Sequence, residues 1–133
     1  MKSIIYILLL SFGFGAVIHV PDDYSTIQEG IDAAMEGDTV LAAAGTYSPS
    51  TNSEVFPIEM ASGIHLIGSG EDVSIIDAQQ RDIVITMEYC DNNTISDLTL
   101  TGALADSYGG GIYLHTSDPI LTNVTISNNT ANY

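Results

Sequence analysis

Two stretches near the end of the chain carry the same apolar pattern, displaced by 26 residues. The matched pairs are Ile95 and Leu121, Leu98 and Val124, and Leu100 and Ile126. A period in the twenties is typical of a solenoid, in which each turn buries its apolar face against its neighbours. Short β-rich runs separated by Gly, Asn and Asp fill residues 63–133, and helical periodicity is absent after Gly37. The pattern therefore leaves a β-solenoid or a β-sandwich as the candidate folds.

The first 15 residues have the composition of an export signal. Lys2 supplies a positive charge, residues 4–10 form an unbroken apolar run, and Gly13 and Gly15 offer small residues before a cleavage site. The apolar stretch 4–18 is shorter than the roughly 20 residues that span a bilayer as a helix. We therefore expect cleavage after residue 15, a secreted or cell-surface protein, and no membrane span in the mature chain.

Residues 16–62 are expected to form an N-terminal strand, one amphipathic helix and the first coil. Ser25 and Gln28 have capping-box spacing, which predicts a helix over 25–36 that Gly37 ends. The apolar stripe of this helix consists of Ile27, Ile31, Ala34 and Met35. Strand signals lie at 17–20 and 38–44, and residues 45–47 read as a turn.

The charge balance excludes several classes of partner. The chain has 17 Asp and Glu residues against 2 Lys and Arg, for a net charge of −15. Such an acidic surface cannot displace phosphate counterions, so nucleic acid is not expected to bind, and polyanionic sugars would require a bridging divalent cation. The hydrophobic fraction of 45% argues against disorder. A single cysteine, Cys90, rules out an internal disulfide framework and a four-cysteine zinc site.

Two segments carry a resemblance to a known superfamily. Residues 18–34, followed by Gly-Asp-Thr-Val at 37–40 and Gly-Thr-Tyr at 45–47, resemble the opening of right-handed parallel β-helix proteins of the pectin-lyase-like superfamily. Residues 109–114 and 128–133 resemble repeats of large secreted bacterial surface proteins of the same superfamily. The resemblance implies an all-β right-handed parallel β-helix of about four coils, with the helix as a cap over the first coil.

The resemblance also bears on the other end of the chain. Terminal repeats of solenoids need a polar cap, and no second capping pattern follows the coils at 63–133. We therefore expect the sequence to be a fragment that stops within the β-helix. An uncapped last coil would present apolar side chains and unpaired backbone groups, so self-association through it is also expected.

The catalytic motifs of the superfamily's enzymes are missing. Lyase chemistry on uronic sugars requires a base and cations, and residues 16–133 contain one basic residue, Arg81, which reads as a turn residue. The polygalacturonase signatures are absent, and the pectinesterase resemblance stops at residue 47. Asp97 reads as a lone, outward-facing acid. No residue is therefore assigned a catalytic or cofactor-binding role.

Calcium is the metal that the turn residues would suit best, because its sites use Asp, Asn and carbonyl oxygens. The residues concerned are Asp91, Asn92, Asn93, Asp118, Asn123 and Asn128. The simpler interpretation is that Asp and Asn favour turns, and we assign no metal ligand. The three histidines, His19, His65 and His115, alternate with apolar residues and should face solvent without metal spacing. Cys90 is expected to be a small, partly buried residue.

The sequence predicts a non-catalytic cell-surface or carbohydrate-recognition scaffold. The alternative is the N-terminal part of a pectate lyase-like or pectinesterase-like enzyme whose active site lies beyond residue 133. Both hypotheses involve a polysaccharide or cell-surface glycan. The residues expected to face inward are Ile64, Leu66, Ile75, Ile83, Ile85, Ile95, Leu98, Leu100, Ile112, Leu114, Leu121, Val124 and Ile126.

Overall fold

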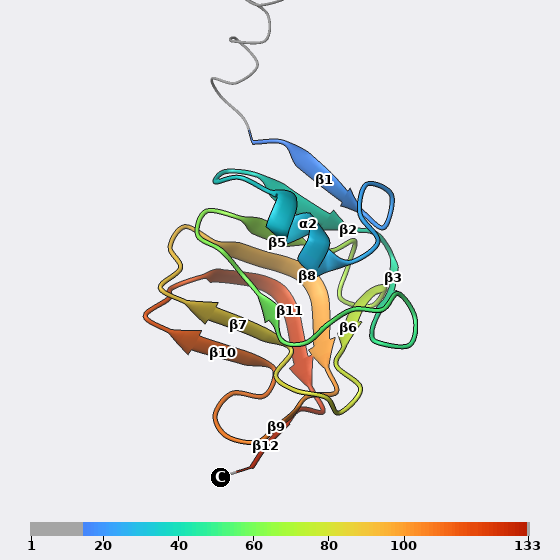
Figure 1. Cartoon of the computed structure of the whole chain (residues 1–133), viewed down its shortest axis with the longest axis vertical. Helices are drawn as coiled ribbons and strands as arrows, with labels where there is room; N and C mark the ends of the chain where they lie inside the picture. Colours follow the sequence, from blue (N-terminus) through green and yellow to red (C-terminus); the bar gives the residue numbers. More distant parts are fainter. Residues whose placement is uncertain (1–14, 133) are drawn as a thin grey trace, which may run out of the picture.

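The computed structural model describes residues 15–132, which form a parallel β-solenoid of about four turns with 6% helix. β1 lies at one end of the stack and β12 at the other, with the remaining strands between them (Figure 1). The predicted signal peptide falls on residues 1–15 and so lies almost entirely outside the described residues. Among residues 15–132, no helix has the length and apolar character required to cross a membrane.

Every strand pair in the structure is parallel. The strands are β1 (Val17–Val20), β2 (Thr39–Ala42), β3 (Gly45–Tyr47), β4 (Ile58–Glu59), β5 (His65–Ile67), β6 (Ser74–Asp77), β7 (Ile85–Glu88), β8 (Thr94–Thr101), β9 (Leu104–Ala105), β10 (Ile112–His115), β11 (Ile120–Ser127) and β12 (Thr130–Ala131). The largest sheet has the order β1-β2-β5-β8-β6-β3, with β11 also paired to β8. A second sheet has the order β10-β7-β4, and β12 pairs with β9.

The register confirms the repeat read from the sequence. Ile95 pairs with Leu121 and Leu100 with Ile126, which is the predicted offset of 26 residues. In β8 the first half pairs with β5 and the second half with β6, so the strand serves two walls of the coil. The two halves meet at Asp97, and β11 has Asn123 at the matching place. Both residues adopt positive φ, 58° and 51°, and these left-handed residues divide the strands.

The core is a column of buried side chains inside the coils. Six predicted core residues are confirmed as buried: Ile64, Leu66, Ile85, Ile95, Leu98 and Leu100. Ile75 and Ile83 were assigned wrongly, since they are only half-buried whereas Ile76 and Val84 are fully buried. In β6 the buried Ser74 donates its hydroxyl proton to the carbonyl of Ala42 at 3.1 Å. Because neighbouring strand residues face opposite sides, an inward Ser74 places Ile76 inside and Ile75 outside.

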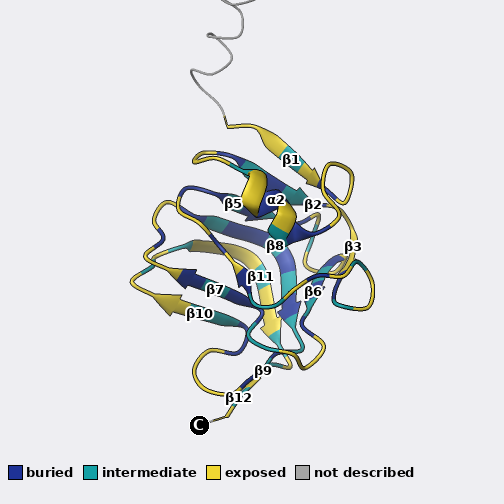
Figure 2. Cartoon of the chain, in the orientation of Figure 1, coloured by how far each residue is buried: buried dark blue, intermediate teal, exposed yellow. Residues whose placement is uncertain are grey.

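The last coil continues the core but leaves it open on one side. Ile112 and Val124 pack against buried residues, as predicted. Leu114, Leu121 and Ile126 remain 45%, 42% and 47% exposed, although they stack on Met87, Ile95 and Leu100 of the preceding coil. Among the described residues no further strand covers β10 and β11, and the exposure of both strands is visible in Figure 2.

The helix α2 spans Ile27–Ala33 and is shorter than the predicted 25–36. Thr26, not Ser25, is the N-cap, and its hydroxyl accepts from the Glu29 N–H at 3.1 Å. At the other end the Asp38 carboxylate accepts from the Met35 N–H at 2.8 Å, which ties residue 35 to the following turn.

Burial along the helix agrees with only part of the predicted stripe. Ile27 and Ile31 are buried in the core as predicted, whereas Met35 is 74% exposed. Helix α2 contacts β1, β2 and β4, so it lies inside the first coil, against the innermost strands. The segment at 45–47 is strand β3 rather than a turn, because it pairs with β6 one coil later.

Candidate functional site

The outward side of the β4–β7–β10 sheet gathers acidic and aromatic side chains from three successive coils. Glu59 of β4 lies beside Thr86 of β7, which lies beside Tyr113 of β10. One pleat further along, Glu88 lies beside His115. We call these five residues, together with Tyr89 at the end of β7, the acidic-aromatic face.

The aromatic part of this face is a contiguous group of three rings. The ring centroids of Tyr89 and His115 are 5.2 Å apart, with an interplanar angle of 77°. The Tyr89 hydroxyl and His115 Nε2 lie 3.3 Å apart and form a hydrogen bond. On the other side, the Tyr113 ring is nearly parallel to His115, with centroids 6.5 Å apart and an angle of 12°. Tyr89 and His115 are exposed, so the group presents ring surface to solvent.

The backbone of Tyr89 is held in a conformation that a bulky residue rarely adopts. Its φ is 54°, in the left-handed region. The Tyr89 N–H donates to the His115 carbonyl at 2.9 Å, and the Ser62 hydroxyl donates to the Tyr89 carbonyl at 3.3 Å. Such a conformation costs on the order of 1–3 kcal/mol and is concentrated at functional sites. The surrounding coils thus stabilise a strained residue whose side chain is 68% exposed.

Next to the rings lies an open cavity of about 290 Å³. It is lined by Glu59, Met60, Thr86 and Glu88. Met60 is 7% exposed and contributes apolar surface, whereas Glu59 and Glu88 are exposed and contribute carboxylates. The cavity can accommodate a polar ligand that offers hydroxyl donors and one apolar surface.

The turn residues considered for calcium have structural partners within the chain. Asn93 is buried and donates its amide protons to the carbonyls of Ala61 and Ile64, at 2.7 and 2.8 Å. The Asn123 amide donates to Asp97 Oδ1 at 3.1 Å. Among residues 15–132, no three His, Cys, Asp or Glu side chains gather closely enough to hold a metal ion. Calcium binding by Asp91, Asn92, Asp118 or Asn128 therefore stays a prediction.

The other residues singled out in the sequence lie apart from one another. Arg81 is exposed in the turn after β6, and Asp97 is half-buried and also accepts from the Ser96 hydroxyl at 2.9 Å. His19 and His115 face solvent as predicted. His65 is only half-exposed, and its Nδ1 atom is buried without a hydrogen-bond partner.

Cys90 is more buried than expected, at 3% exposure. Its thiol lies 3.4 Å from the Met60 carbonyl and 3.3 Å from the Glu88 carbonyl, within hydrogen-bonding distance of both. These contacts give the thiol a place in the packing beneath the acidic-aromatic face.

Two titratable groups with shifted pKa values lie at the α2 end of the solenoid. Burial raises the pKa of the Glu54 carboxyl, against the opposing effect of hydrogen bonds from the Ile27 and Gln28 N–H groups. Burial also raises the pKa of Tyr47 to about 12, and nearby carboxylates add to the shift. The Tyr47 hydroxyl lies 2.7 Å from the Ala43 carbonyl. Both groups serve the packing of the first coil.

Sequence reasoning identified His115 but missed the other members of the face. The signal was available, because the repeat offset of 26 residues aligns Tyr89 with His115. Comparison of the chain with protein-family models, curated proteins and solved structures finds no match. Function is therefore inferred from the geometry of the face.

Proposed function

We propose that this protein is an exported, non-catalytic scaffold that recognises carbohydrate through the acidic-aromatic face. The observation that carries the proposal is the ring group Tyr89–His115–Tyr113 beside a cavity with two carboxylates. Sugar rings have apolar C–H surfaces that pack on aromatic rings, and hydroxyl groups that donate to carboxylates. The face offers both kinds of contact within adjacent strands.

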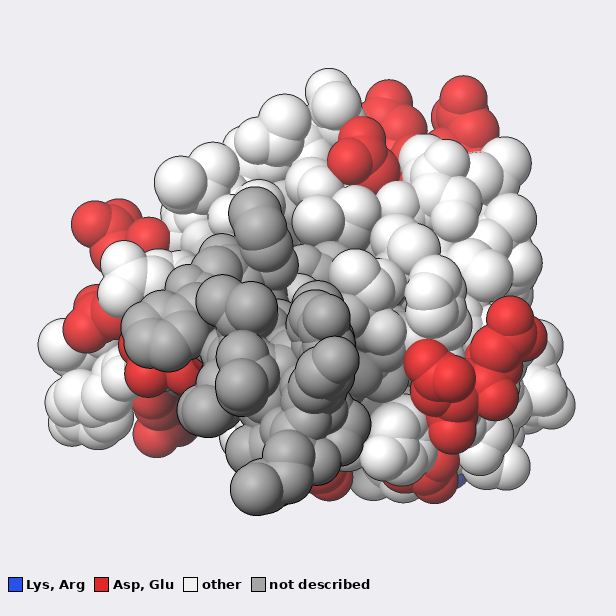
Figure 3. Space-filling model, turned by 90° about the horizontal axis from the view of Figure 1, so that it is seen from above, with Lys and Arg blue, Asp and Glu red and all other residues white. Residues whose placement is uncertain are grey.

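The charge distribution favours a neutral sugar over an acidic one. With 17 acids and 2 bases in the chain, a polyanion approaching the protein is repelled. Seen from the β1 end, carboxylates stand at several places around the periphery of the molecule (Figure 3). Glu59 and Glu88 line the cavity directly, so a uronic acid placed there would face two like charges. A neutral glycan suffers no such repulsion.

We further propose a right-handed solenoid of the pectin-lyase-like superfamily, in which α2 caps the first coil. Right-handed crossovers connect about 98% of parallel strand pairs within a sheet. The buried side chains of Ile27 and Ile31 support the capping role. In addition, the Gln28 carboxamide accepts from the Glu59 N–H at 2.7 Å and donates to the Glu59 carbonyl at 3.2 Å. A side chain thereby pairs with β4 on the edge facing α2.

Calorimetric titration with linear neutral glycans (β-1,4-glucan, xylan and mannan oligosaccharides) tests the recognition role, with polygalacturonate as the acidic comparison. We expect a neutral glycan to bind without being cleaved. Replacing Tyr89 or His115 with Ala should weaken binding about tenfold, since loss of a stacking ring costs roughly 0.5–1.5 kcal/mol beyond its buried area.

Tyr24 provides the matched control. It is 40% exposed and lies between β1 and α2, outside the acidic-aromatic face. Tyr24→Ala should bind glycan like the unmodified chain. The proposal is wrong if no neutral glycan binds at millimolar concentration, or if Tyr24→Ala loses as much affinity as Tyr89→Ala. Release of shortened sugars would instead support the enzymatic alternative.

A further inference from the structure

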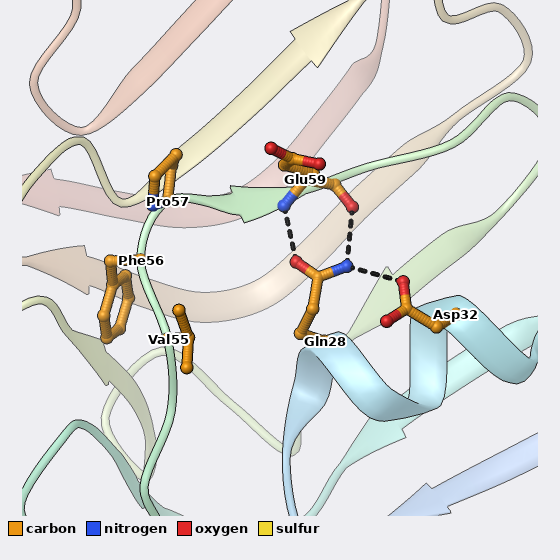
Figure 4. A pocket seen from close by; sticks show the side chains of 6 residues that line it. All are labelled: Gln28, Asp32, Val55, Phe56, Pro57 and Glu59. Carbon is orange, nitrogen blue, oxygen red and sulfur yellow. Dashed lines mark hydrogen bonds between the residues drawn. The ribbon is translucent and has the colours of Figure 1, made fainter.

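A second open cavity lies beside the first, between α2 and the segment that leads into β4. Its volume is also about 290 Å³. It is lined by Gln28, Asp32, Val55, Phe56, Pro57 and Glu59 (Figure 4). Glu59 belongs to both cavities, so they meet at this residue. The two cavities and the ring group thus follow one another across α2, β4, β7 and β10.

Hydrogen bonds fix the floor where the cavities meet. The Gln28 carboxamide is bound to both backbone polar groups of Glu59 and donates a further hydrogen bond to Asp32 Oδ1 at 2.9 Å. With its main chain held in this way, the exposed side chain of Glu59 stands between the cavities. Asp32, Glu59 and Glu88 therefore place carboxylates along the path, while Val55 adds an apolar side chain that is 68% exposed.

We propose that the two cavities and the ring group act as a single groove, which binds a linear neutral polysaccharide lying across the strands, parallel to the solenoid axis. This inference rests on the proposed carbohydrate recognition and specifies its ligand. Neighbouring strands are about 4.8 Å apart, so the path from α2 to β10 extends over about 14 Å. One sugar ring cannot fill that length, and a chain of several linked rings can.

The lining determines what kind of chain fits. Carboxylates at successive strands accept hydroxyl protons from successive sugars, and the rings at the β10 end and Val55 at the other end contact apolar sugar surfaces. No Lys or Arg lines either cavity. A chain of uronic acids would therefore have its charges uncompensated along the whole groove, whereas a neutral chain binds through hydroxyls and ring faces.

The test compares oligosaccharides of two, four and six sugars from the β-1,4-linked gluco-, xylo- and manno-series, by calorimetric titration. For the series that binds, we expect affinity to rise about tenfold or more from the disaccharide to the hexasaccharide. Val55→Ser and Glu59→Gln should lower hexasaccharide affinity several-fold and leave disaccharide affinity unchanged. Tyr89→Ala should lower both, because the rings contact every ligand.

Val73→Ser is the matched control for the apolar change, since Val73 is 46% exposed and lines neither cavity. Circular dichroism of each variant confirms that it is folded before titration. Affinity that does not depend on length, or a Val55→Ser variant that binds the hexasaccharide like Val73→Ser, would overturn the extended groove and leave the ring-group site in place. Absence of binding to any of the three series would overturn both proposals.

Discussion

Replacing Glu54 with Ala should destabilise the protein strongly, although Glu54 lies outside any helix or strand. Glu54 is 2% exposed. Its Oε2 atom accepts from the Ile27 N–H at 2.8 Å and from the Asn52 amide at 3.1 Å, and its Oε1 atom accepts from the Gln28 N–H at 3.1 Å. A carboxylate from a distant segment thus satisfies the first N–H groups of α2, which have no partner within the helix.

The magnitude follows from these contacts. Glu54→Ala leaves two helix N–H donors without a partner, and each buried donor left unsatisfied costs about 1–3 kcal/mol. Part of this loss is recovered because the variant no longer buries a carboxylate, an unfavourable burial that also raises the pKa of Glu54. We expect a net loss of about 2–4 kcal/mol in the free energy of unfolding, which shifts the urea midpoint by roughly 1–2 M.

Urea denaturation followed by circular dichroism measures the effect. Glu29→Ala is the matched control, because Glu29 is an exposed acid in the first turn of the same helix. Removing it should change stability by less than about 1 kcal/mol. Equal urea midpoints for Glu54→Ala and Glu29→Ala would refute the assignment of Glu54 as the group that satisfies the helix N–H donors.

The same residue gives a pH dependence with a defined sign. Because the pKa of Glu54 is higher in the folded protein, its contribution to stability is fully present below the unfolded carboxyl pKa and is lost as pH rises through the folded value. Glu54→Gln cannot titrate. The stability of the unmodified protein relative to Glu54→Gln should therefore fall as pH rises from about 4. A difference that grows with pH would contradict the raised pKa.

Three further predictions concern stability and association. Ile31→Asp, which buries a charge in the core, should cost several kcal/mol, whereas Asp32→Asn on the exposed side should change stability by less than about 0.5 kcal/mol; comparable urea midpoints would show that α2 contributes little to the core. The buried Tyr47 hydroxyl titrates near pH 12 rather than 10, so stability should be complete below pH 10 and decline above it, and Tyr47→Phe should abolish that decline in alkaline urea titrations. The open edge of β11 should associate with other chains as salt screens the charge of −15, over a Debye length of about 10 Å at 0.1 M, with calcium more effective than sodium at equal ionic strength; a monomer at every salt concentration in sedimentation velocity would exclude this.

The sequence predicted the repeat well because the repeat is a property of spacing alone. An offset of 26 residues between Ile95 and Leu121 became a strand pair in the structure. The side of the strand on which a residue lies was harder to predict in β6, because the sequence offers two adjacent isoleucines, Ile75 and Ile76. The choice between them depends on the Ser74 hydroxyl bonding to a carbonyl 32 residues away, a contact that periodicity does not reveal.

The extent of α2 and the candidate site were missed for the same kind of reason. Helical spacing includes Met35, but Asp38 bonds its N–H and the helix ends earlier. The acidic-aromatic face is assembled from residues of three coils, each unremarkable in its own segment. It becomes visible only when the 27-residue offset that pairs Ile58 with Ile85, and Ile85 with Ile112, is applied to all outward side chains.

The parallel register between successive coils has a consequence for how the chain can acquire its structure. Each strand from β5 onward finds its partner in the coil synthesised just before it, and α2 with β1 and β2 supplies the initial template. Loop closure over one coil involves similar chain lengths throughout, so adding a coil carries nearly the same entropic penalty each time. The polypeptide can therefore fold in order as it emerges N-terminus first, without waiting for its last residues. A chain released at any coil boundary would leave an ordered stack behind it, with one growing edge.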